Sequence, residues 1–484
     1  MGYSNQVEPQ YPAGKRQLLK LLALMGALGL IIAFAPLGTL SLLIIFTLGL
    51  VSFLRPVFAL YLLALLLPFN LALPSKVVEV FGIQTLLLVE ILIPLLFLPL
   101  LFNLLLNDDI QRLKRALSFP LLVFLGINIL SAINATSYFY YFGQIAKLIT
   151  YLLFYILVVM TIKREDELRR FIRLFLASGI VVVILSLLEY FTKVRILSNI
   201  MFDQSLSFIT ITDGLRRLAS VFGQANVFGT FLGFLALFTL GLFIEKNKSL
   251  SKNFLALYLL LVSLAILFTF SRGTILALLF ALTLFAIFTL KLRWVFRIGL
   301  ILLVLAIFVD IFAPFKLLYV RLEEAVHLRG PALTRVNLWL VGLDMFKTHP
   351  FLGVGAGNFT EHFVKFAAQK KALEKILSEG LILSPHSIYI ELLATTGLAG
   401  LASFAWVSAS FFKRGLRLYK TLPDGPLRGI ILGSILGLAF FILSGFVRES
   451  FADITFSLLF FMTFALVEVS HCLINEKIRE LHNA

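Results

Sequence analysis

Arg217, Arg272 and His386 have the right chemistry to act on a phosphate-bearing substrate at a membrane surface. Arg217 and Arg272 each lie just before a long apolar run, and His386 immediately precedes another. Guanidinium groups match the geometry of phosphate oxygens in a bidentate way. A neutral imidazole can accept a proton near neutral pH. Fixed cations that neutralise a diphosphate leaving group, with a base for an attacking hydroxyl, would support group transfer.

Each of these residues also has a simpler explanation. Arg272 could extend to lipid headgroups from the hairpin that we expect at residues 271–273. Arg216 and Arg217 could likewise contact headgroups, and His386 could help to cap the helix that follows it. Asn226 is expected as the N-cap of the next helix, with Gln224 lining the same spot.

The composition places these residues in a membrane protein. Hydrophobic residues make up 60% of the 484 positions, charged residues 14%, and the mean hydropathy is +0.99. The single cysteine, Cys472, excludes an internal disulfide and a zinc site of several cysteines. The formal charge of +16 suits anionic headgroups and basic cytoplasmic loops, so we expect membrane lipids and no nucleic acid as partners.

The apolar runs predict an all-α, polytopic integral membrane protein with about 12–14 transmembrane helices, because about 20 apolar residues cross a bilayer as a helix. They leave no room for a separate soluble domain, so residues 1–484 are expected to form a single membrane domain. The runs cover residues 18–34, 40–53, 57–71, 86–106, 120–130, 142–160, 171–190, 227–243, 254–270, 274–290, 295–312, 388–412, 430–446 and 454–472.

Basic residues in the short connections predict the orientation, because Lys and Arg concentrate in cytoplasmic loops. Alternating the spans places most of them on one side, among them Lys163, Arg164, Lys291, Arg293, Lys413 and Arg414. The tails at residues 1–16 and 473–484 are then cytoplasmic. The loop at 191–226, which carries the arginine pair, and the long loop at 314–387 face the periplasm or cell exterior.

The long loop is the longest polar passage in the chain, and a bare connection needs only about 2–8 residues. Long ordered loops often carry binding or catalytic residues. We expect short helices in it, including an amphipathic one around residues 338–346 that His349 and Pro350 end. The glycine cluster at 353–357 would let the backbone turn sharply or approach a substrate closely. The polar candidates here are Arg335, Trp339 and Asn358, and Glu391 follows on the first turns after His386.

Four pieces of the sequence, in this order, resemble the O-antigen ligase and polysaccharide polymerase superfamily of bacterial membrane glycosyltransferases. Arg217–Asn226 is similar to the family's Arg-x-x-Gly-x-Phe-x-x-x-Asn segment, and Ser271–Gly273, Trp339–Phe359 and His386–Gly400 match its later segments. The chain departs from the family at Ser220, where glycine is usual. Gln224-Ala225 also replaces the common Asn-Pro.

The resemblance implies an enzyme of the bacterial inner membrane with its active site on the periplasmic face. Such an enzyme transfers a glycan from undecaprenyl diphosphate to a sugar hydroxyl of lipid A core or another acceptor, without a metal or other cofactor and with inversion. Arg217 and Arg272 would bind the diphosphate, and His386 would activate the hydroxyl or orient the donor. The further candidates for substrate binding are Arg216, Arg335, Gln224, Asn226, Trp339 and Asn358.

Three functions remain open from the sequence. A ligase moves a finished glycan to a cell-surface acceptor, whereas a polymerase of the same superfamily joins lipid-linked repeats and shares most of these motifs. A transporter of a small anion would also use many spans and arginines. The unusual charges gather at one membrane face rather than at the midplane, and no inverted repeat is evident, which disfavours transport.

Overall fold

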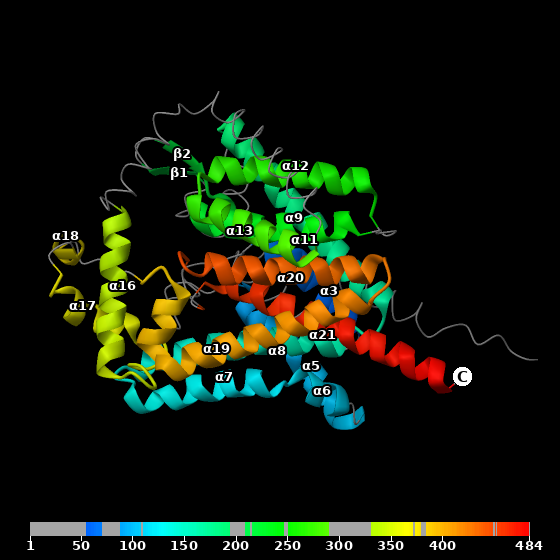
Figure 1. The fold of residues 1–484 in the computed structure, drawn as a ribbon, viewed down its shortest axis with the longest axis horizontal. Helices are drawn as coiled ribbons and strands as arrows, with labels where there is room; N and C mark the ends of the chain where they lie inside the picture. The colour runs from blue at the N-terminus through cyan, green and yellow to red at the C-terminus, as the bar shows by residue number, and fades with distance from the viewer. Residues whose placement is uncertain are drawn as a thin grey trace, which may run out of the picture.

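The chain folds into a bundle of roughly parallel and antiparallel helices, shown in Figure 1. This computed structural model describes residues 55–69, 88–107, 110–193, 209–212, 215–245, 250–289, 331–370, 373–378, 384–448, 451 and 453–483. The predicted spans at 18–34, 40–53 and 295–312 and the predicted tail at 1–16 lie outside these residues.

The membrane body contains a helix for each of the other predicted spans. Seven helices in the described part of the chain are long and apolar enough to cross a membrane, and four shorter apolar helices accompany them. They are α3 (Pro56–Leu66), α5 (Leu88–Asn107), α7 (Phe119–Leu130), α8 (Tyr138–Thr161), α9 (Glu165–Thr192), α11 (Ala225–Ile244), α12 (Lys252–Thr269), α13 (Arg272–Thr289), α19 (Ile388–Thr421), α20 (Pro426–Ser444) and α21 (Ile454–Asn483). The predicted all-α polytopic membrane class is confirmed.

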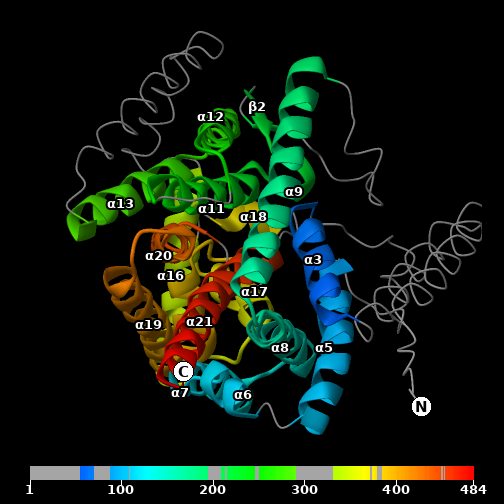
Figure 2. The same cartoon turned by 90° about the vertical axis from the view of Figure 1, so that its right-hand side faces the viewer.

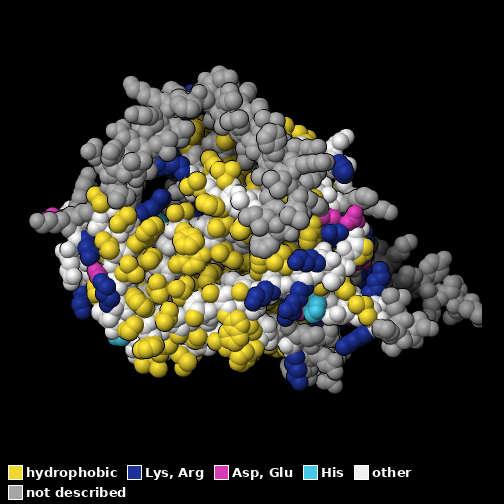
Figure 3. Space-filling model, in the orientation of Figure 1, with side chains coloured by type: hydrophobic (Ala, Val, Ile, Leu, Met, Phe, Trp, Pro, Cys, Tyr) yellow, Lys and Arg dark blue, Asp and Glu magenta, His cyan; other side chains and the backbone are white. Residues whose placement is uncertain are grey.

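The surface has separate apolar and basic zones, as expected for a protein that crosses a membrane (Figure 3). Figure 3 shows a wide apolar zone across the middle of the bundle, with basic side chains gathered towards its two ends. Helix α21 runs through the centre of the bundle among α8, α11, α19 and α20, as the end-on view in Figure 2 shows. It continues as a helix to Asn483, so most of the segment predicted as a tail at 473–484 is helical. The protein is a multi-pass membrane protein.

Glycines bring α11 and α20 into backbone contact. Gly429, Gly433 and Gly437 follow at four-residue intervals on α20, so they line one face of the helix. A Cβ added to Gly241 of α11 would lie 2.3 Å from the backbone nitrogen of Gly433. Small residues at such spacing let the backbones of two membrane helices approach closely. Van der Waals contact then holds the helices together, because lipid provides little hydrophobic driving force between them. This contact fixes α11, which carries the arginine segment at its start.

One end of the bundle carries the elements that lie outside the helices of the membrane body. On the left of Figure 1 are β1 (Ile209–Thr212), β2 (Leu215–Leu218), α16 (Pro331–Thr348), α17 (Phe359–Ala367) and α18 (Glu374–Ser378). The two strands form an antiparallel hairpin that the sequence analysis did not predict. Helix α16 ends directly before His349, as predicted. The remaining short elements are α6 (Ile110–Ala116) and the 3-10 turns η1 (Leu67–Phe69), η2 (Ser131–Asn134) and η3 (Ser220–Phe222).

The glycine cluster after α16 docks onto a break in α19. Gly397 has φ 67° and ψ −164°, which interrupts the helix and frees backbone groups on either side. The loop uses them: the amides of Val354 and Gly355 donate to the carbonyls of Ala394 and Thr395 at 2.9 and 3.0 Å. Backbone pairing replaces the helical bonds that the break removes. Gly353, Gly355 and Gly357 all have positive φ, so the sharp turn expected here is confirmed. The close approach is to the backbone of α19, whereas the sequence predicted an approach to a sugar.

Gly353→Ala is expected to destabilise this docking by about 2 kcal/mol or more. Gly353 has φ +67°, a conformation that disfavours a side chain, and its Cβ would lie 2.3 Å from the backbone carbon of Thr395. Thermal unfolding of the purified protein in detergent measures the loss. Gly143→Ala on α8 is the control, because no atom lies within 4 Å of the added Cβ. Equal melting temperatures for Gly353→Ala and Gly143→Ala would contradict this packing.

Candidate functional site

Strand β2 separates the adjacent arginines. Successive side chains on a strand point to opposite faces, and Arg216 and Arg217 pair with Ile211 and Thr210 of β1. The Arg216 guanidinium lies over the ring of Tyr190, 5.3 Å from its centroid. Arg217 points the other way, towards the start of α11 and the end of α12. Of the pair, Arg217 thus enters the site, while Arg216 is held by a cation–π contact.

Two acceptors from different helices orient Arg217. Its Nε donates to the carbonyl of Thr269 at 2.9 Å, and its Nη2 donates to Oδ1 of Asn226 at 2.8 Å. Thr269 is the last residue of α12, where carbonyls lack partners within the helix. The sequence analysis missed Thr269, although its place at a helix end next to Arg272 was a usable signal.

The prediction that Asn226 caps α11 is wrong. The helix begins at Ala225, so its N-cap residue is Gln224, whose side chain makes no capping hydrogen bond. Asn226 lies inside the first turn, and its side-chain oxygen accepts from Arg217 instead. Gln224 is exposed, and among the hydrogen bonds of the described residues none connects its side chain to Arg217 or Asn226.

Arg272 begins α13 directly opposite this site. Only Phe270 and Ser271 separate α12 from α13, which confirms the tight hairpin expected here. Phe270 has φ 49°, so the chain reverses through a left-handed residue. Buried hydroxyls secure the turn: Oγ1 of Thr274 donates to Oγ of Ser271 at 2.9 Å. The turn places Arg272 at the same end of the bundle as Arg217.

Arg335 joins them from the long loop. Arg335 and Trp339 are four residues apart on α16 and therefore share one face of that helix. Burial lowers the pKa of the Arg217 guanidinium, and the nearby positive charges of Arg272 and Arg335 lower it further. Three arginines from β2, α13 and α16 thus create a concentrated positive field in a poorly hydrated place. Such a field favours a multiply charged anion.

His386 lies in a segment that is fixed at both ends. The Trp339 indole Nε1 donates to the carbonyl of Pro385 at 3.0 Å, and the Ile388 amide donates to the carbonyl of Gly445 at 2.9 Å. His386 itself has φ 47°, an uncommon left-handed conformation for a side chain of this size. Between these two contacts the imidazole is presented at the mouth of α19.

The segment that follows α20 links His386 to Arg272. A Cβ on Gly273, the neighbour of Arg272, would lie 2.8 Å from Cγ2 of Val447. Val447 comes two residues after Gly445, which accepts from Ile388. The starts of α13 and α19 therefore flank one short turn of chain. The structure thus brings together three of the predicted residues, Arg217, Arg272 and Arg335, with Asn226 as a contact of Arg217. His386 precedes α19 at the same end of the bundle, and Trp339 contacts its neighbour Pro385.

Asn358 has a structural place instead. It is fully buried, and its Oδ1 accepts from the Ser137 amide at 2.7 Å and from Oγ1 of Thr136 at 3.3 Å. Its Nδ2 donates to the carbonyl of Ala356. These bonds tie the glycine loop to the start of α8. The sequence predicted Asn358 as a substrate contact, and the structure does not bring it to the arginines.

Ser220 shows why a family glycine would suit that position. It has φ 53°, in the left-handed region where glycine is favoured, and it is buried. Its hydroxyl shares a hydrogen bond with that of Ser186 on α9. The hydroxyl contact offsets part of the backbone strain, and the turn that positions Arg217 is preserved.

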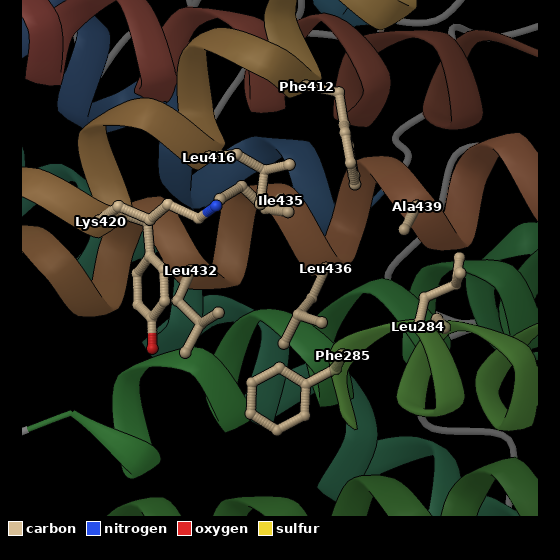
Figure 4. Close-up of a pocket in the computed structure, with 11 residues that line it drawn as sticks. Leu284, Phe285, Phe412, Leu416, Lys420, Leu432, Ile435, Leu436 and Ala439 are labelled. Atoms are coloured by element: carbon tan, nitrogen blue, oxygen red, sulfur yellow. The ribbon is translucent and has the colours of Figure 1, made fainter. Parts of the chain in front are cut away.

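An apolar pocket lies away from these charges. It is formed by the second half of α13 together with α19 and α20, and Figure 4 shows leucine, isoleucine and phenylalanine side chains converging on it. Lys420 at its edge is its one charged lining residue. Its lining provides no base or anion-binding group comparable to the arginine site.

Fold and site together define a class: a multi-pass helical membrane protein with a cationic, histidine-bearing site at one end of its bundle. Residues 257–405, from α12 into α19, match the O-antigen ligase family model. The resemblance to the O-antigen ligase superfamily is therefore confirmed, over a stretch that includes Arg272, Arg335 and His386 but not Arg217. No curated protein matches the chain.

Proposed function

We propose that this protein is an O-antigen ligase-like glycosyltransferase that transfers a glycan from undecaprenyl diphosphate to a sugar hydroxyl. The observation that carries the proposal is the proximity of Arg217, Arg272 and Arg335, at the end of the bundle where His386 precedes α19. The family match, which supports ligase- or polymerase-type chemistry on lipid-linked glycans, agrees with it.

The arginines would hold the donor. A diphosphate linked to a lipid carries its charge at the membrane surface, where the starts of α11 and α13 lie. Two fixed guanidinium groups can bind oxygens of both phosphates, and Asn226 and Thr269 hold Arg217 in place before the donor arrives. As the bond from the sugar to the diphosphate breaks, the same cations neutralise the charge that develops on the leaving oxygen.

His386 would accept the proton of the acceptor. The acceptor oxygen forms a bond to the anomeric carbon while the bond from that carbon to the diphosphate oxygen breaks, and the leaving group retains the electron pair. The hydroxyl proton passes to the imidazole. Attack from the side opposite the diphosphate inverts the anomeric centre. The arrangement requires no redox partner, and we propose that it requires no metal.

The orientation follows from charge. The connections at the other end of the bundle hold Lys163, Arg164, Lys413 and Arg414, which the bias of basic residues towards the cytoplasm places inside. The arginine site would then face the periplasm of a bacterial inner membrane. Lipid A core or another surface glycan is the acceptor that we propose on that side.

Purified protein in detergent tests the proposal directly. With an undecaprenyl diphosphate-linked glycan and lipid A core, we expect glycan-bearing core to form on a gel, in EDTA as well as without it. Product that forms only when a second lipid-linked repeat replaces the core would make the protein a polymerase. An intact donor with both acceptors would contradict glycan transfer, and loss of product in EDTA would contradict a metal-independent reaction.

A further inference from the structure

A polar crevice opens beneath the glycine loop, beside the start of α19. Asn128 of α7, Gln144 of α8, and Glu391 and Thr395 of α19 line it, together with the backbone at Gly357. Apolar lining comes from Ala356, Ile388, Leu392 and Phe451. Gln144 and Glu391 are half-buried, so the crevice remains open to the surrounding solvent. Its volume is about 10 Å³, enough for one group of the size of water or a hydroxyl.

The lining has the chemistry of a carbohydrate site. Sugars present neighbouring hydroxyls, which carboxylates and amides bind with hydrogen bonds of defined direction. The Thr395 hydroxyl donates to the carbonyl of Glu391 at 2.7 Å, and Nδ2 of Asn128 donates to the carbonyl of Phe124 at 2.8 Å. These bonds orient the Thr395 and Asn128 oxygens as acceptors.

Gly357 forms the roof of the crevice because it has no side chain. It has φ +75°, and a Cβ there would lie 2.5 Å from the carbonyl oxygen of Tyr140 and 2.9 Å from Cβ of Gln144. The loop thus lies directly on α8. Asn358 holds it there through the Ser137 amide, so the crevice is preformed rather than dependent on a mobile segment.

The segment that carries His386 contacts both this crevice and the helix of Arg335. Ile388, two residues after His386, lines the crevice, while Trp339 and the turn at Val447 lead from the same segment towards Arg335 and Arg272. A base that takes a proton from an attacking hydroxyl must lie between donor and acceptor.

We propose that this crevice receives a hydroxyl group of the acceptor sugar, with Glu391 and Gln144 as the residues that bind it. The proposal rests on the proposed function, because it assigns the second substrate of the same reaction. Glu391 binds the acceptor and orients the attacking hydroxyl towards His386. The donor diphosphate makes no contact with it.

Glu391→Gln and Gln144→Ala test the assignment. Losing one hydrogen bond to a charged group weakens binding by about ten- to a hundredfold, so KM for the acceptor should rise by that factor for Glu391→Gln and by a smaller one for Gln144→Ala. KM for the lipid-linked donor should be unchanged. Binding of a free core oligosaccharide to purified protein, measured without donor, should weaken in parallel.

Glu361→Gln is the matched control, because Glu361 is an exposed glutamate on α17 at the same end of the molecule but outside the crevice. Melting temperatures confirm that each variant folds. An unchanged acceptor KM in both crevice variants, or a rise in donor KM equal to that for acceptor, would overturn the acceptor site while leaving glycan transfer established. Absence of transfer by the wild-type protein would overturn the proposed function itself.

Discussion

Arg217→Lys is expected to reduce glycan transfer by about a hundredfold or more. Lysine keeps the charge, but its three donors share one nitrogen, so they cannot reproduce the spread of guanidinium donors that reaches Thr269, Asn226 and a phosphate oxygen. The loss should appear mainly in kcat, since stabilisation of the leaving diphosphate grows in the transition state. Steady-state transfer from undecaprenyl diphosphate glycan measures it, with melting temperature as the check on folding.

The neighbouring arginine provides the control. Arg216→Lys makes the same chemical change one residue away, but Arg216 lies on the opposite face of β2 over Tyr190. We expect its transfer rate to remain within about threefold of wild type, because Arg216 lies away from the phosphate site and Arg216→Lys keeps the positive charge near Tyr190. Equal losses of transfer rate in Arg216→Lys and Arg217→Lys would contradict the assignment of Arg217 alone to the phosphate site.

The same charges predict a response to ligand. Because Arg272 and Arg335 lower the pKa of Arg217, a bound diphosphate relieves repulsion among the three groups. Added inorganic diphosphate should therefore raise the melting temperature of the wild-type protein and should have less effect on Arg217→Lys. This measurement reports binding even where transfer is too slow to observe.

The helical framework and the main cations could be predicted from the sequence for a simple reason. Apolar runs must cross the membrane as helices, and a charge at the end of such a run is unusual enough to suggest a function. Arg272 and His386 were found in this way. Arg217 was found as one of a pair, but the sequence could not tell it from Arg216. That distinction depends on a strand, since in a helix the two side chains would not point to opposite faces.

Other features depend on contacts between distant parts of the chain and could not be predicted from the local sequence. Asn226 satisfies the rules for an N-cap, but the helix starts earlier and a guanidinium competes for its oxygen. The glycine cluster indicated a close approach to a substrate, but the partner is the break in α19 at Gly397. Asn358 belongs to a polar segment, yet its bonds are to the start of α8. In each case a tertiary partner decided between two locally reasonable roles.

His386→Gly is expected to reduce transfer by about 10²–10⁴-fold, the range for removal of a general base. Glycine is the informative replacement because His386 has φ 47°, which glycine adopts without strain. The backbone should therefore remain in place, and the melting temperature should not fall. Donor binding, followed by the diphosphate-induced shift in melting temperature, should persist because the arginines are untouched.

Added imidazole distinguishes catalysis from positioning. If His386 removes the proton, free imidazole should restore part of the activity of His386→Gly, since the deletion leaves a space at the mouth of α19. Trp339→Phe is the companion variant: it removes the hydrogen bond to Pro385 but keeps the imidazole, so we expect about a tenfold loss that imidazole does not restore. Restoration of both variants, or of neither, would mean that His386 acts by holding its segment in place, and the base would have to be sought elsewhere in the site.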